Sequence, residues 1–172
     1  MMNRRKTISV LGAGLLMYPT GGLAFSLPLN VVATTGMIAD LIQNVGGSLV
    51  NVNSIMGPGV DPHSYRHTRS DILTMAKADA VFYHGLDLEV HMFDFFHQLS
   101  AKRKVTAITE GINKSKFLAY EDYENAYDPH IWMDPMIWAE TIDPLVDTLR
   151  QIIPAQSDIL TANASAYRAQ LN

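Results

Sequence analysis

The sequence predicts an α/β fold in which helices flank an open, mostly parallel four-stranded sheet. Short β-branched runs alternate along the chain with segments of helical periodicity. Strands that are separated by helices favour parallel pairing through right-handed crossovers. The chain has no cysteine, so no disulfide can replace a packed core.

The predicted strands are short and rich in apolar residues. One of them, ADAVFY at residues 78–83, is apolar enough to be buried on both faces, and the segment at residues 49–55 alternates valine with asparagine. The expected strands are residues 30–34, 49–55, 78–83 and 104–108.

The helices are predicted from apolar stripes and from their end signals. Gly46 and Gly47 stop a first helix at residues 37–45, and Thr68 caps a second helix with Asp71 three residues later. A third is expected at residues 88–99. Later, Pro144 is expected to kink a helix or to restart it with Asp143 as the cap. In the helix that follows Pro135, the apolar stripe consists of Trp138, Ile142, Leu145, Leu149 and Ile152. In the last helix it consists of Leu160, Ala164, Tyr167 and Leu171.

Residues 1–26 have the pattern of a secretory signal peptide. Arg4, Arg5 and Lys6 precede an apolar stretch that is too short to span a membrane, and small residues follow it. We expect cleavage after Ala24 or Ser26 and a mature product in the periplasm.

The mature chain is expected to be acidic. Removing the three basic residues of the leader changes the formal charge from 13 − 17 = −4 to 10 − 17 = −7. An acidic protein is a poor partner for nucleic acid or anionic membranes. Because there is no cysteine, we expect no lipid anchor and no thiolate ligand, which leaves histidine and carboxylate for any metal.

Two histidines stand out because each follows Asp-Pro. These are His63, after Asp61 and Pro62, and His130, after Asp128 and Pro129. Proline stiffens each loop, and ligands of an open α/β sheet bind at the carboxyl ends of its strands. We therefore predict that one cleft receives both imidazoles as metal ligands, with Asp61, Asp128 and Asp134 as acceptors that orient a ring.

The other histidines fit structural roles better. His67 is predicted to be solvated, and His84, at the carboxyl end of the third strand, to be a core or hydrogen-bonded residue beside the cleft. His91 and His97 fall on the polar side of their helix, where no ligation is expected. The methionines on core stripes are interpreted as packing residues.

Four motifs occur in the order found in one family. They are VVATTGMIADLIQNVGG, MGPGVDPHSY, KADAVFYHGLDLE and DPHIWMDP. With these motifs the chain resembles the TroA-type metal receptors, which are solute-binding proteins of ABC importers for zinc and manganese. The resemblance implies two α/β lobes that a long helix connects, a Zn²⁺ or Mn²⁺ ion held between them, and a membrane permease as partner.

Carried onto this chain, the first-lobe ligands of that family match His63 and His130. The resemblance implies an N-terminal lobe at residues 27–154 and the start of the connecting helix at residues 155–172, with the second lobe absent. The segment from Ser64 to Asp71 departs from the usual family pattern by carrying Arg66 and Arg69. We expect a truncated, impaired receptor that binds Zn²⁺ weakly and Mn²⁺ hardly at all.

Two other functions stay open from the residues alone. A metal-dependent hydrolase could use an open two-histidine site, although the chain has no His-Glu-x-x-His motif. A metal-independent adhesin would not need either histidine. Replacing both histidines would separate these possibilities, because transport and hydrolysis need them.

Overall fold

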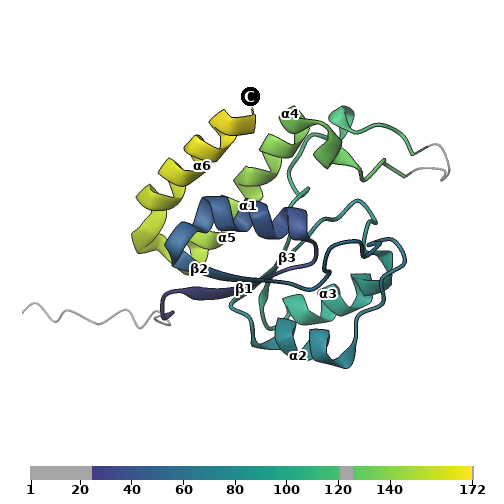
Figure 1. Ribbon diagram of the computed structural model, residues 1–172, viewed down its shortest axis with the longest axis horizontal. Coiled ribbons are helices and arrows are strands. Elements are labelled where there is room, and N and C mark those ends of the chain that lie inside the picture. Colours follow the sequence, from purple (N-terminus) through teal and green to yellow (C-terminus); the bar gives the residue numbers. More distant parts are fainter. Residues whose placement is uncertain (1–24, 121–125, 172) are drawn as a thin grey trace, which may run out of the picture.

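The computed structural model describes residues 25–120 and 126–171, and these form a parallel sheet with helices on both faces (Figure 1). The sheet order is β2-β1-β3-β4, and every neighbouring pair is parallel. The predicted open four-stranded sheet is therefore confirmed. The strands are β1 (Leu29–Ala33), β2 (Val50–Ser54), β3 (Ala80–Tyr83) and β4 (Lys104–Ala107).

The helices fill the connections between strands and the C-terminal third of the chain. The α-helices are α1 (Gly36–Gly46), α2 (Arg69–Lys77), α3 (Phe93–Ser100), α4 (Pro135–Trp138), α5 (Ile142–Ile152) and α6 (Ser157–Leu171). Short 3₁₀ turns are η1 (Gly47–Leu49), η2 (Val90–Met92), η3 (Lys114–Lys116), η4 (Ile131–Met133), η5 (Ala139–Thr141) and η6 (Pro154–Gln156).

The central strand β1 is buried on both faces and separates two apolar clusters. Val31 and Ala33 pack into the larger cluster with α1, α5 and α6, whereas Val32 packs into the smaller one with residues of α2 and α3. This alternation is what a strand with helices on both sides requires. In Figure 1 the first group of helices lies on one side of the sheet and α2 and α3 lie on the other.

Helix α6 is attached to α1 by polar contacts as well as by its apolar stripe. The Asn163 amide donates to the Val45 carbonyl at 3.0 Å, and the Tyr167 hydroxyl donates to the Asp40 carboxylate at 3.1 Å. Leu160, Ala164 and Tyr167 are buried against the larger cluster. The last predicted stripe therefore packs as expected.

Local start signals explain where some helices begin. The capping box of Thr68 and Asp71 opens α2 as predicted. The helix expected over residues 88–99 begins later, at Phe93, because Glu89 lies outside the helical region with φ of −99° and ψ of 49°, and Val90–Met92 form the 3₁₀ turn η2. Asp143 lies in the first turn of α5 instead of capping it.

The predicted signal peptide cannot be compared with the structure over most of its length. Residues 1–24 lie outside the described residues. Among the residues that are described, no helix is both long and apolar enough to cross a membrane.

Candidate metal site

Two loops at the carboxyl ends of the strands bring the predicted histidines together. His63 lies between β2 and α2, and His130 immediately precedes η4. Their Nε2 atoms are 3.4 Å apart, and their ring centroids are 5.3 Å apart with planes tilted by 45°. Both side chains are half-buried. The two Nε2 atoms thus lie close enough together to contact one small ligand.

Asp128 orients the imidazole of His130. Its Oδ1 atom lies 2.6 Å from His130 Nδ1 and also accepts a hydrogen bond from the His130 backbone N–H at 2.9 Å. The backbone bond is the main reason that the pKa of Asp128 falls below its usual value, and the side-chain bond adds to it. An ionised carboxylate only accepts, so the ring proton resides on Nδ1 and Nε2 faces the cleft with its lone pair.

Asp61 shapes the other loop instead of orienting its ring. Its carboxylate accepts from the His63 backbone N–H at 3.0 Å and from the Ser64 hydroxyl at 2.8 Å. The Ser64 bond is the largest cause of the lowered pKa of Asp61. Asp134 accepts from two backbone N–H groups at the start of α4. Of the three predicted acceptors, Asp128 is therefore the one whose contacts reach an imidazole.

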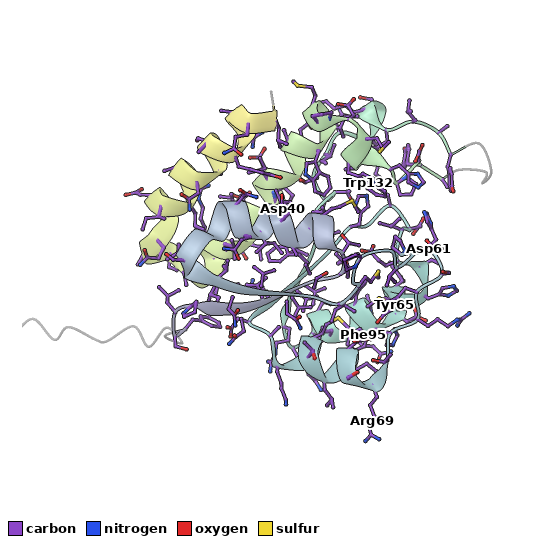
Figure 2. All side chains as sticks on the ribbon, in the orientation of Figure 1. Asp40, Asp61, Tyr65, Arg69, Phe95 and Trp132 are labelled. Carbon is purple, nitrogen blue, oxygen red and sulfur yellow. The ribbon has the colours of Figure 1, made fainter. Side chains whose placement is uncertain are left out.

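Aromatic rings surround His130, a feature that the sequence prediction missed. Trp132 packs edge-on against it at 5.1 Å, and Tyr120 lies at 6.4 Å. Figure 2 shows Trp132 and Asp61 on the same side of the molecule, among the loops. The Trp in DPHIW was the available signal, since it lies two residues after His130. A hollow of about 350 Å³ adjoins His130 and includes Leu118 and Met133, both largely exposed.

The remaining histidines have different environments. His84 is fully buried, as the prediction of a core position required. The prediction that His67 is solvated was wrong, because Phe95 stacks on its ring at 5.1 Å and half-buries it. His91 and His97 are exposed. Within residues 25–120 and 126–171, no group of three or more His, Asp or Glu side chains is arranged to hold a metal ion.

Both imidazoles lie at the carboxyl ends of the strands of a parallel sheet, which is where open α/β folds bind their ligands. The family described as "ZnuA: Zinc-uptake complex component A periplasmic" matches residues 31–172, and the chain belongs to this family. It is a family of solute-binding proteins of metal importers rather than of enzymes. The resemblance to TroA-type receptors is therefore confirmed.

Similar proteins bear names that refer to zinc and to manganese. The zinc-binding protein TroA of Treponema pallidum is 37% identical over 142 residues, which are 83% of this chain and 46% of that protein. The manganese-binding lipoprotein MntA of Bacillus subtilis is 34% identical over 152 residues, which are 88% of this chain and 49% of MntA.

Solved structures agree with the fold. The periplasmic zinc-binding protein TroA from Treponema pallidum aligns with a TM-score of 0.78 and 36% identity, covering 83% of this chain and 51% of that one. The Mn-bound periplasmic metal-binding protein of Candidatus Liberibacter asiaticus aligns with a TM-score of 0.73 and 27% identity, covering 83% and 52%. The chain thus spans about half the length of the relatives that it matches.

Proposed function

We propose that this chain binds a divalent transition metal, Zn²⁺ or Mn²⁺, in the periplasm for delivery to the permease of an ABC importer. His63 and His130 are the ligands that this lobe supplies. The observation that carries the proposal is the 3.4 Å separation of their Nε2 atoms. Membership of the zinc-uptake family supports the transport role.

The nitrogen separation fits a single zinc ion. Two ligands at about 2.0–2.1 Å from a tetrahedral Zn²⁺ lie roughly 3.3–3.4 Å from each other. Two imidazoles whose Nε2 atoms are 3.4 Å apart can therefore bind one ion with little movement. The metal replaces no proton on His130, because Asp128 already holds the ring proton on the opposite nitrogen.

The ligand count sets the expected strength of binding. Two imidazoles fill two of four tetrahedral positions and leave the others to water or to groups outside this lobe. Imidazole is a better ligand for Zn²⁺ than for Mn²⁺, which prefers carboxylate oxygens. We expect weak zinc binding and weaker manganese binding by the chain as it stands.

The division of the chain follows from the same proposal. We assign residues 27–154 to the metal-binding lobe and residues 155–172 to the start of the connecting helix that the family resemblance implies. The Asn163 and Tyr167 contacts to α1 support this role, because they fix the direction in which α6 leaves the lobe. MntA is named a lipoprotein, and the printed sequence of this chain contains no cysteine.

A metal titration tests the proposal. Zinc and manganese affinities are measured for the purified chain and for His63→Ala, His130→Ala and the control His97→Ala, whose histidine is exposed on α3. We expect the unsubstituted chain to bind one zinc ion. His63→Ala and His130→Ala should lose this binding, and the control His97→Ala should keep it. Binding that survives both substitutions would overturn the assignment.

A further inference from the structure

His84 is a buried imidazole that the two-ligand site does not use. It immediately follows β3, is fully buried and has neither ring nitrogen hydrogen-bonded within the part of the chain described. Burial lowers its pKa to about 4, so the ring is neutral at neutral pH. An apolar ring of the same shape would avoid the cost of two unpaired polar atoms, so this histidine calls for an explanation.

The backbone of His84 is held firmly. Its N–H donates to the buried Glu89 carboxylate at 2.8 Å, and the same carboxylate accepts from the Thr34 hydroxyl at 2.6 Å. Glu89 thereby ties the residue after β3 to the residue after β1. The backbone position of His84 is consequently fixed relative to the sheet.

The indole of Trp132 contacts both the His84 ring and the ring of His130, the proposed ligand. Trp132 meets the His84 ring edge-on at a centroid distance of 5.3 Å, and Trp138 lies nearly parallel to the His84 ring at 6.4 Å. Trp132 also packs against His130 at 5.1 Å. Any shift of His84 would therefore reach the ligand through the Trp132 indole.

The Pro129 carbonyl, in the loop that carries His130, faces the His84 ring. The Pro129 carbonyl lies near enough to favour a proton on His84, although the pair falls short of hydrogen-bond geometry. Pro129 directly precedes His130 in the sequence. Because Pro129 and His130 are adjacent in one loop, a movement of His130 towards a metal ion moves this carbonyl as well.

We propose that His84 is a positioning residue for His130: its ring N–H donates to the Pro129 carbonyl when metal draws the Asp-Pro-His loop into the cleft, and this bond holds the loop there. The inference rests on the proposed function, because it assumes that His130 binds the metal. It explains why a neutral imidazole occupies a site where an apolar ring would fit.

The variant His84→Phe keeps the ring and removes the N–H. We expect its metal-free melting temperature to be no lower than that of the unsubstituted chain, and its zinc affinity to be about tenfold lower. A purely structural role would leave the affinity of the well-folded variant unchanged. The control His97→Phe makes the same substitution at an exposed position and should bind zinc normally.

Nitrogen-15 spectra of the unsubstituted chain test the same bond without relying on a variant. We expect a His84 ring N–H signal that becomes protected from exchange when zinc is added. Zinc binding with no protected His84 signal, or normal affinity in His84→Phe, would overturn this inference alone. Failure of the unsubstituted chain to bind zinc through His63 would overturn the proposed function as well.

Discussion

Replacing Asp128 by asparagine tests how much the orientation of His130 contributes to metal binding. The substitution keeps the shape of the side chain and removes its charge. The amide oxygen can still accept both hydrogen bonds that Asp128 Oδ1 now accepts from His130, at 2.6 and 2.9 Å, but as a neutral acceptor. The bond to Nδ1 is the one that strengthens the ring as a ligand.

The expected loss of affinity follows from the change in that bond. A hydrogen bond to a charged group contributes about 1.5–3 kcal/mol, and a neutral one about 0.5–1.5 kcal/mol. The difference of roughly 1.4 kcal/mol corresponds to about a tenfold weaker zinc affinity. This agrees with the 10- to 100-fold range typical of residues that orient a metal ligand.

Competition with a chromophoric chelator at neutral pH measures this change. Asp134→Asn is the matched control, because its carboxylate caps α4 and its hydrogen bonds go to Met136 and Ile137. We expect the control to bind zinc as the unsubstituted chain does. An Asp128→Asn affinity within twofold of the unsubstituted chain would refute the role given to Asp128.

Two further substitutions test the loops near the site. Gly85→Ala should destabilise the fold by about 3 kcal/mol in chemical denaturation, because φ is +87° and the added Cβ would lie 2.5 Å from Thr109 Oγ1. Gly59→Ala, with φ of +78° and open space, should cost about 1 kcal/mol, and equal losses would contradict the steric argument. His84, whose pKa burial lowers to about 4, binds fewer protons when folded than when unfolded. Stability should therefore fall as pH drops from about 6.5 to 4, by about 3 kcal/mol, and His84→Phe should lack this loss. Identical pH dependence in both chains would contradict the neutral, buried state.

The sheet and its faces were predictable because their signals are local. Strand β3 reads as a continuous apolar run, and the apolar residues of α5 repeat at helical spacing, so the burial of both elements could be predicted from the sequence pattern. The late start of α3 was not predictable, since no local signal shows that Glu89 leaves the helical region and that Val90–Met92 form a 3₁₀ turn. That turn is accompanied by the contacts of Glu89 with the residues after β1 and β3.

The candidate site was predictable in part. The repeated Asp-Pro-His setting and the carboxyl-end rule were enough to expect His63 and His130 in one cleft. The sequence alone does not show which of Asp61, Asp128 and Asp134 orients an imidazole. This depends on the backbone turn that places the Asp128 carboxylate beside His130 Nδ1. The stacking of Phe95 on His67 depends on packing between distant segments, which no local pattern encodes.

In the proposed site, His63 and His130 bind the same metal ion. Anomalous diffraction at the zinc edge from crystals of the zinc-loaded chain tests it most directly. We expect one strong peak about 2.0–2.1 Å from both Nε2 atoms. A peak that contacts only one of these rings, or that lies at an exposed histidine such as His91 or His97, would contradict the claim.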